Sequence, residues 1–231
     1  YLRRYIGARE LLSSNPRWCI WLKDASNDEI KSSKHLLDRV LKVKKFRENS
    51  KAKSTRESAN TPHLFRQISQ ASDHYLCIPR HVSEARQFFT IDYFDQDTIA
   101  SDATFIADDP NLIAFSVLSS SMFISWFKLT GGRIKSDLRF NKLLVYNTFP
   151  MRDLSKDELQ DLKFAGKNLL TIRHFLRTQS LSSMYKEPLS IELIKAHSNI
   201  DRIIDGVFDS NENSEPERMD ILINSYRLAN A

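Results

Sequence analysis

The chain has 231 residues, of which 41% are hydrophobic and 27% charged, with a formal net charge of +5. These values describe an ordinary soluble globular protein of one or two domains. No apolar run approaches the roughly 20 residues that a membrane helix needs, and no signal-peptide pattern opens the chain. Two cysteines, Cys19 and Cys77, are too few for a disulfide framework, so we expect a reducing cytoplasm. The chain begins at Tyr1 without an initiator methionine, and we expect it to be a piece of a larger polypeptide.

Charge is distributed unevenly along the chain. Residues 31–57 hold ten Lys or Arg against three Asp or Glu, whereas residues 201–220 hold seven Asp or Glu against two Arg. A basic segment of this kind can neutralise phosphates, and an acidic one would repel them. The pattern is also compatible with a solvated helix face, so charge alone leaves nucleic-acid binding open.

The first 150 residues are expected to form a mixed α and β domain. Aromatic and branched residues between turn signals predict strands at residues 17–22, 75–79, 88–93 and 98–106. A helix is predicted over residues 27–49 and a polar loop over residues 50–61. From Leu112 the apolar period changes to three and four residues, which predicts an amphipathic helix that Gly131 caps at its C-terminus.

After Pro150 the sequence predicts helices only. Ser155-x-x-Glu158 is a capping box that starts the first helix, a second is expected over about 190–208, and Ser214-x-x-Glu217 starts a third. The fold class is therefore α+β: a mixed α/β domain over residues 1–150, followed by a small helical bundle over residues 151–231. We expect the two units to meet through the aromatic residues Trp126, Tyr146 and Phe149.

Four sequence motifs suggest catalysis or cofactor binding, and each is incomplete. Asn15-Pro16-Arg17-Trp18 lacks the second proline of an adenine methyltransferase loop, and Glu29-Ile30-Lys31 lacks the partner carboxylate of a nuclease. Residues 131–136 contain Lys-Ser without the preceding glycine of a phosphate-binding loop. Cys77 and His81 are two potential ligands, which do not make a zinc site. We expect no catalytic residue, metal site or cofactor within this chain.

Polar residues in loops are candidates for contacts with DNA. Lysine suits phosphates, arginine can form two hydrogen bonds with guanine, and a carboxylate can accept one from cytosine. Candidate phosphate contacts are Lys42, Lys44, Lys45, Arg47 and Arg80. Candidate base readers are Glu84, Arg86, Arg133, Lys135, Ser136, Asp137 and Arg139. If the backbone between Gly131 and Asn141 is extended, the alternating charged residues 133, 135, 137 and 139 point the same way. A helix on one side and a strand leading to Tyr146 on the other are expected to anchor this loop. Salt bridges within the loop are the alternative use of these side chains.

Several short motifs follow one another in a characteristic order. In the first part they are Tyr5-Ile6-Gly7, Arg17 to Leu22, Ile78-Pro79-Arg80, Ser83-Glu84-x-Arg86, Gly132 to Arg139, and Tyr146 to Pro150. This order resembles the target recognition region of MmeI-like enzymes, which fuse a restriction endonuclease and a DNA adenine methyltransferase in one polypeptide. Residues 180–226 resemble the C-terminal helical segment of the same family, in Pro188-Leu189, Ala196-His197 and Glu217-Arg218 among others.

The resemblance implies a recognition domain that reads an asymmetric site in double-stranded DNA, with a helical segment packed on it, in the bacterial cytoplasm. It implies methyltransferase and endonuclease domains upstream of Tyr1, where S-adenosylmethionine and Mg²⁺ would bind. Two alternatives remain: the specificity module of a phage-defence methyltransferase that does not cleave, and a basic protein-interaction module without a DNA role.

Overall fold

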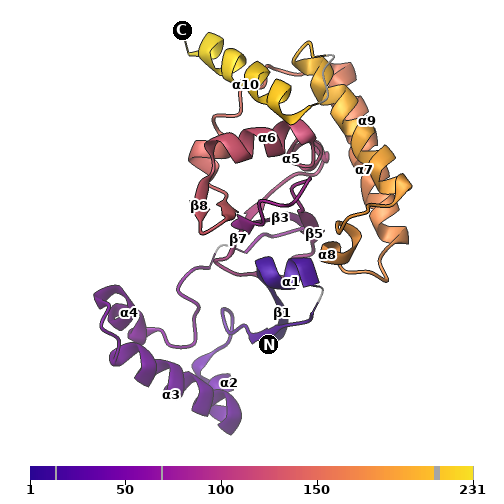
Figure 1. The fold of residues 1–231 in the computed structure, drawn as a ribbon. Coiled ribbons are helices and arrows are strands. Elements are labelled where there is room, and N and C mark those ends of the chain that lie inside the picture. Colours follow the sequence, from indigo (N-terminus) through magenta and orange to yellow (C-terminus); the bar gives the residue numbers. More distant parts are fainter. Residues whose placement is uncertain (14, 69, 211–213, 231) are drawn as a thin grey trace.

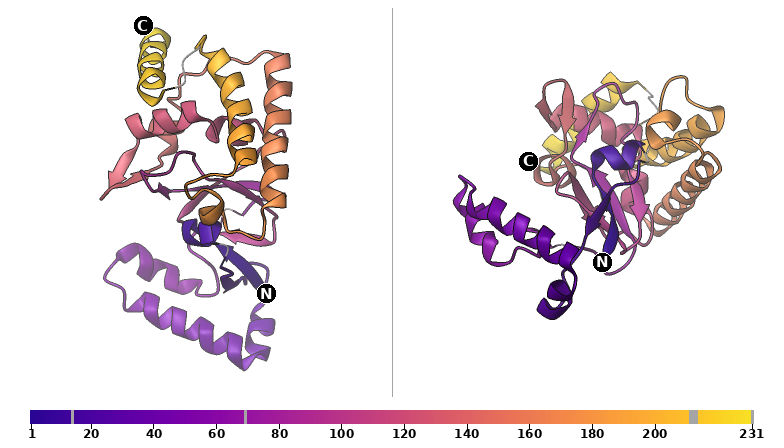
Figure 2. Two further views of the ribbon diagram at one scale, coloured as in Figure 1. Left: turned by 45° about the vertical axis from the view of Figure 1, so that its right-hand side comes forward. Right: turned by 90° about the horizontal axis from the view of Figure 1, so that it is seen from below.

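The computed structural model describes residues 1–13, 15–68, 70–210 and 214–230. Residues 211–213, which belong to the predicted acidic segment, lie outside these. Three small sheets form the centre, helices cover them on one side, and a helical arm projects from the opposite end (Figures 1 and 2). The predicted mixed α/β fold with a helical C-terminal segment is confirmed.

The strands are short, and each sheet has three of them. The first sheet has the order β2-β1-β6, the second β5-β3-β7 and the third β4-β9-β8. Their bounds are β1 Leu2–Ile6, β2 Trp18–Ile20, β3 Tyr75–Pro79, β4 His81–Val82, β5 Asp92–Phe94, β6 Thr98–Ala100, β7 Thr104–Ala107, β8 Gly132–Ile134 and β9 Asp137–Arg139. Of the predicted strands, residues 75–79 form the buried centre of the second sheet. Residues 98–106 instead divide between two sheets as β6 and β7, and only the end of residues 88–93 enters β5.

The basic segment forms an arm of short helices. It contains α2 (Asn27–Ser32), α3 (Lys34–Glu48), α4 (Lys53–Glu57) and a 3₁₀ turn (Ser58–Asn60). The single helix predicted over residues 27–49 is interrupted at Ser33, whose side chain accepts a hydrogen bond from the backbone N–H of Leu36 and so caps α3. The predicted loop over residues 50–61 is wrong, because it contains α4.

Aromatic residues hold the centre of the molecule together. The predicted helix after Leu112 is two helices, α5 (Ile113–Leu118) and α6 (Ser121–Thr130), because the Ser120 side chain caps the second. Phe123 and Phe127 of α6 are fully buried and pack with Phe89 and Phe140. Through Phe140, the residue after β9, this cluster packs α6 against the segment that carries β8 and β9.

The C-terminal helices cover one side of the central part of the molecule, away from the arm. They are α7 (Lys156–Phe175), α8 (Leu181–Met184), α9 (Ile191–Val207) and α10 (Glu215–Ala229), and both predicted capping boxes, at Ser155 and Ser214, are present. The helices do not form a separate bundle: α7 packs on α9 and on α5, while α10 packs mainly on α6. One hydrophobic core therefore continues across residue 150.

Two of the three predicted aromatic contacts join the recognition part to the C-terminal helices. Trp126 packs on Tyr226 with ring centroids 5.5 Å apart, and Phe149 packs on Phe208 at 5.6 Å. Tyr146 is 45% exposed and forms no ring contact with the C-terminal helices among the described residues.

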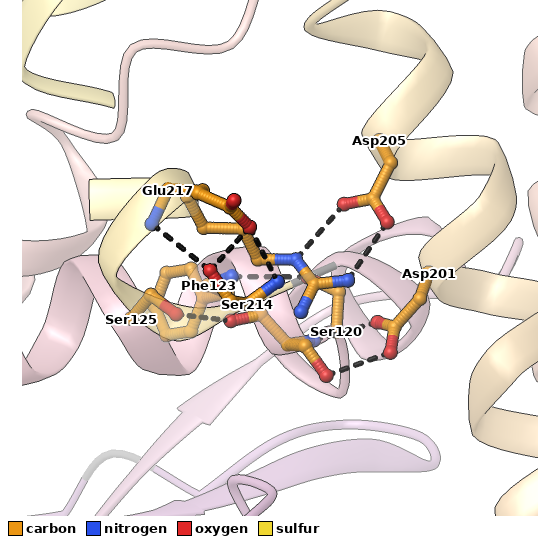
Figure 3. A network of polar contacts seen from close by, with 9 residues as sticks. Ser120, Phe123, Ser125, Asp201, Asp205, Ser214 and Glu217 are labelled. Carbon is orange, nitrogen blue, oxygen red and sulfur yellow. Dashed lines mark hydrogen bonds and ion pairs between the residues drawn. The ribbon is translucent and has the colours of Figure 1, made fainter. Parts of the chain in front are cut away.

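Polar contacts lock α9 and α10 to the start of α6 (Figure 3). The Asp201 carboxylate accepts hydrogen bonds from the Ser121 backbone N–H at 2.7 Å and its hydroxyl at 2.6 Å. One turn further along α9, Asp205 forms a buried ion pair with Arg218 of α10, with Nη2 2.8 Å from Oδ2. The acidic segment predicted to repel DNA thus contributes structural contacts. No helix in the described ranges is long and apolar enough to cross a membrane.

Candidate nucleic-acid interface

The segment predicted to read bases is a β-hairpin built on α6. Gly131 is the C-cap of α6, as predicted, and its N–H bonds to the Phe127 carbonyl. A Cβ there would lie 2.5 Å from that same oxygen, so the close approach requires glycine. The chain then forms β8 and β9, and β9 pairs with β4. The hairpin is therefore anchored to the core through α6 at one end and β4 at its side.

The register of the hairpin decides which side chains share a face. Arg133 is paired with Leu138, whereas Gly132 is paired with Arg139. Directly paired residues point to the same face, and neighbours along a strand point to opposite faces. Because Leu138 and its neighbour Val82 are buried, their face is the inner one, and Asp137 and Arg139 lie on the outer face. The predicted single row of residues 133, 135, 137 and 139 is therefore wrong.

Arg139 occupies an open position on the outer face. Its neighbour on β8 is Gly132, which has no side chain, and its neighbour on β4 is His81. Arg139 is exposed and forms no ion pair within the described part of the chain. Its guanidinium is free to take a partner from outside the protein. His81 was not predicted as a member of this face, and only the strand pairing reveals it.

The tip of the hairpin is the two-residue turn Lys135-Ser136. Lys135 has a φ of 57°, in the left-handed region that residues with a side chain seldom adopt. Glycine or asparagine is the usual residue at such a position. Both tip residues are exposed, so a lysine and a hydroxyl project furthest from the sheet. Beyond the hairpin, the predicted strand leading to Tyr146 is instead a π-helical turn, Lys142–Tyr146.

Arg133 is held at the edge of the hairpin by Glu84. The two form an ion pair with Nη1 2.6 Å from Oε1, and both remain about half exposed. The structure thus brings two of the predicted base readers together from segments almost fifty positions apart. A salt bridge of this kind is the use that the sequence analysis gave as the alternative to base reading.

Two predicted contact residues direct their guanidinium groups into the protein. Arg47 donates to the carbonyl oxygens of Ser58, Thr61 and Leu64 at 2.8, 3.0 and 2.7 Å. Burial lowers the pKa of Arg47, yet an arginine stays protonated. Its side chain braces the inner side of the arm.

Arg86 similarly donates to two carbonyl oxygens of the α8 segment, those of Ser182 at 3.3 Å and Tyr185 at 3.0 Å. Burial lowers the pKa of this arginine too. Its side chain ties the loop after β4 to the C-terminal helices, a role for which the sequence offered no signal.

The lysines predicted to contact phosphates lie on α3, along the arm. Lys42 forms an (i, i+4) ion pair with Asp38 at 2.7 Å, and Lys44 one with Glu48 at 3.9 Å. All these side chains are at least half exposed, and such pairs contribute only about 0.3–0.5 kcal/mol. A phosphate can therefore displace these partners at low cost. Lys45 is exposed and forms no ion pair within the described residues.

The incomplete catalytic motifs have structural roles where the structure describes them. Glu29 completes the capping box of α2, and the Tyr1 hydroxyl donates a hydrogen bond to it at 2.7 Å, which together with the cap holds the pKa of Glu29 at about 2. Cys77 is buried in β3, where burial raises the pKa of its thiol to about 12. In the described ranges no three His, Cys, Asp or Glu side chains are grouped to hold a metal ion.

A known family covers the part of the chain that carries this hairpin. Residues 1–153 match the family described as the MmeI target recognition domain. The chain belongs to this family. The assignment made from the order of the sequence motifs is thus confirmed.

Two relatives extend the likeness over the whole chain. DNA methyltransferase A of Bacillus subtilis (strain 168) is 30% identical over 229 residues, which are 98% of this chain and 26% of that protein. The solved structure of the type IIL restriction-modification enzyme MmeI in complex with DNA is 36% identical and superposes with a TM-score of 0.96. It covers 100% of this chain, which covers 31% of that one. The MmeI-like chain described here thus spans about a quarter to a third of the length of these relatives.

Proposed function

We propose that this chain reads a specific site in double-stranded DNA with its β8–β9 hairpin, as the recognition module of a restriction-modification protein. One observation carries the proposal: Arg139 has no ion pair among the described residues and lies on the outer face of a hairpin that α6 and β4 anchor. Site-specific recognition requires polar side chains on a rigid support. Membership of a target recognition family supports this interpretation over that of a basic protein-interaction module.

Different parts of the chain have different tasks in this proposal. Arg139, Arg133, Asp137 and the tip residues Lys135 and Ser136 contact bases or the edge of a groove, with Glu84 positioning Arg133. Lys42, Lys44 and Lys45 contact phosphates along the arm. Phosphate contacts supply affinity irrespective of sequence, whereas contacts to base edges supply specificity. The arm and β8 project on the same side of the body, which allows one duplex to touch both (Figures 1 and 2).

The chemistry belongs to other parts of the parent polypeptide. We propose that the parent is a DNA adenine methyltransferase that binds S-adenosylmethionine and also cleaves DNA with Mg²⁺, and that it acts in the bacterial cytoplasm. A methyltransferase that does not cleave is the second candidate, favoured by the relative named DNA methyltransferase A. The recognition chain is compatible with both, since neither activity depends on its residues.

Mapping methylated adenines in the genome of cells that express the full-length protein tests the proposed function. A single methylated motif is expected, and it should disappear from cells that lack the protein. Absence of any motif-specific methylation, together with absence of sequence-specific binding by the full-length protein, would refute the proposal. Exposure of unmethylated DNA to the purified protein with Mg²⁺ then separates the cleaving parent from the one that only methylates.

A further inference from the structure

A pocket lies where the arm joins the body, next to the hairpin sheet. It has a volume of about 590 Å³ and is lined by aromatic and arginine side chains, among them Tyr5, Trp21, Phe65, Arg66, Arg80 and Phe105. Phe65 and Arg66 lie in the segment that follows the 3₁₀ turn at the end of the arm, whereas Arg80 immediately precedes β4 of the hairpin sheet. The pocket therefore lies between the two elements proposed to contact DNA.

The backbone of Arg80 is fixed on both sides. Its N–H donates to the Ala103 carbonyl at 3.0 Å, and its own carbonyl accepts from the N–H of Phe140, directly after β9, at 2.8 Å. The guanidinium then lies over the Phe105 ring, with Cζ 4.7 Å from the ring centroid. The position of this charge is thus tied to the end of β9, where Arg139 is the neighbour of Phe140 in the chain.

The guanidinium of Arg80 has no polar partner among the described residues. Its Nε is fully buried without a hydrogen-bond acceptor, and no carboxylate lies within 4.0 Å. Asp102 lines the same pocket but is exposed and outside that distance. Five N–H groups of an arginine normally find acceptors, and a buried donor without one is costly. Arg47 and Arg86, by contrast, each use carbonyl groups of the fold.

Nη1 and Nη2 of Arg80 are not among these fully buried atoms, so they can take an anion with several acceptor oxygens from outside the protein. The planar fork of arginine matches a phosphate, with which it can form two parallel hydrogen bonds. Arg66 also lines the pocket, but its guanidinium donates to the hydroxyls of Thr55 and Ser54 in α4. On the proposed function, the pocket lies on a path by which a DNA strand could run from the hairpin to the arm.

We propose that Arg80 binds one phosphodiester of that strand and thereby fixes the register of the hairpin on the duplex. This inference rests on the proposed function but names a distinct site within it. The Phe140 N–H, next in the chain to Arg139, donates to the Arg80 carbonyl. The backbones that carry Arg80 and Arg139 are therefore held at a fixed separation. The pocket then acts as a fixed reference point for base reading.

A double-mutant cycle that combines a change of Arg80 with a change of one DNA phosphate tests this site. The probes are duplexes that contain the methylated motif, each with one uncharged methylphosphonate in place of a phosphate. They are titrated with the full-length protein. The protein is either unchanged or carries Arg80→Met, which keeps an apolar stem over Phe105. Lys167→Ala on the exposed outer side of α7 is the matched control for removal of one charge.

We expect one position in the duplex at which the methylphosphonate no longer affects binding by Arg80→Met. Arg80→Met should weaken binding roughly tenfold to hundredfold, as for a hydrogen bond to a charged group. Methylphosphonate at a single position should weaken binding by the unchanged protein and have no further effect on Arg80→Met. Arg80→Lys, which keeps the charge but not the fork, should recover only part of the affinity.

Other outcomes overturn the inference. If every methylphosphonate weakens Arg80→Met as much as the unchanged protein, Arg80 binds no phosphate, although the proposed function stands as long as specific binding is seen. If the unchanged protein shows no preference for the motif, the proposed function fails and this inference fails with it. Circular dichroism and thermal unfolding of Arg80→Met exclude misfolding as the cause of weaker binding, and Arg80→Lys provides a second variant if Met is not tolerated.

Discussion

Arg133 of β8 and Glu84, two residues beyond β4, are joined by an ion pair with Nη1 2.6 Å from Oε1. The side chains are 44% and 49% exposed, so the pair contributes at most about 1 kcal/mol to folding. The pair orients Arg133 at the edge of the hairpin. Because it is weak, DNA can replace Glu84 as the partner of Arg133. Arg139, on the opposite face, has no ion-pair partner among the described residues that DNA would have to replace.

Substitution of Arg139 or Arg133 by alanine should relax or switch one position of the methylated motif. An arginine that forms two hydrogen bonds with guanine discriminates by roughly 1–3 kcal/mol, concentrated at one base pair. Motif mapping by methylation sequencing of cells that express each full-length variant measures this. If activity falls equally on all sites and the motif is unchanged, the two arginines contact phosphates instead.

Replacing Lys42, Lys44 and Lys45 with alanine should weaken binding to all DNA sequences alike. For each phosphate that the protein no longer neutralises, the slope of log affinity against log salt should become shallower by about 0.9. Binding titrations across a range of salt concentrations measure that slope. Alanine at Lys156, Lys167 and Lys186, exposed lysines of the C-terminal segment, is a control with equal charge change. Equal slopes in the two triple variants would place the arm away from DNA.

Lys135→Gly should separate stability from binding at the hairpin tip. Lys135 has a φ of 57°, and a left-handed backbone costs a residue with a side chain roughly 1–2 kcal/mol. Glycine removes that cost, so the free energy of unfolding should rise relative to Lys135→Ala, while neither variant can present an ammonium group to DNA. Urea unfolding and DNA titration of the two variants give both quantities. Unchanged DNA affinity in both would show that the lysine does not touch DNA.

Arg218→Met should destabilise the protein by about 3–5 kcal/mol, since it leaves the buried Asp205 carboxylate without its ionic partner. Both side chains of this pair are only 8% exposed. The double variant Asp205→Leu with Arg218→Met should recover much of the stability, because the Asp205 carboxylate is then no longer buried without its partner. Chemical unfolding of the single and double variants tests this, and a single variant as stable as the parent would contradict it.

His197 should make the fold sensitive to mild acid. The ring is stacked on Phe88 and bonded to the Tyr185 hydroxyl and the Ser119 carbonyl, and burial, aided by the positive charge of Arg173, lowers its pKa to about 3. The unfolded chain binds this proton near pH 6.5, so the stabilising contribution is complete above that pH and is lost progressively as the pH falls toward 3.

The free energy of unfolding measured at pH 7 and pH 5 checks this dependence. In His197→Gln the difference between the two values should shrink, whereas in His174→Gln, an exposed histidine of α7, it should be unchanged. An unchanged difference in His197→Gln would mean that another group carries the acid sensitivity.

The sequence by itself determined the features that depend on neighbouring residues and on motif order. Ser155-x-x-Glu158 and Ser214-x-x-Glu217 predicted the starts of α7 and α10, because a capping box is closed by hydrogen bonds within four residues. Tyr75 to Pro79 predicted a strand from its composition, and this strand is β3. The ordered motifs identified the family, since each could be read along the chain without its spatial partners.

Only the tertiary structure decided which distant groups meet. The pairing of β8 with β9 puts Arg133 and Arg139 on opposite faces, and a shift of one residue would exchange them. Arg47, Arg80 and Arg86 look equivalent in sequence, but two reach carbonyl groups of the fold and one does not. Helix α10 packs mainly on α6, where Tyr226 meets Trp126, while the Asp205–Arg218 ion pair joins α10 to α9. Long-range packing and hydrogen-bond partners decide these outcomes, and the periodicity of a single segment carries no information about them.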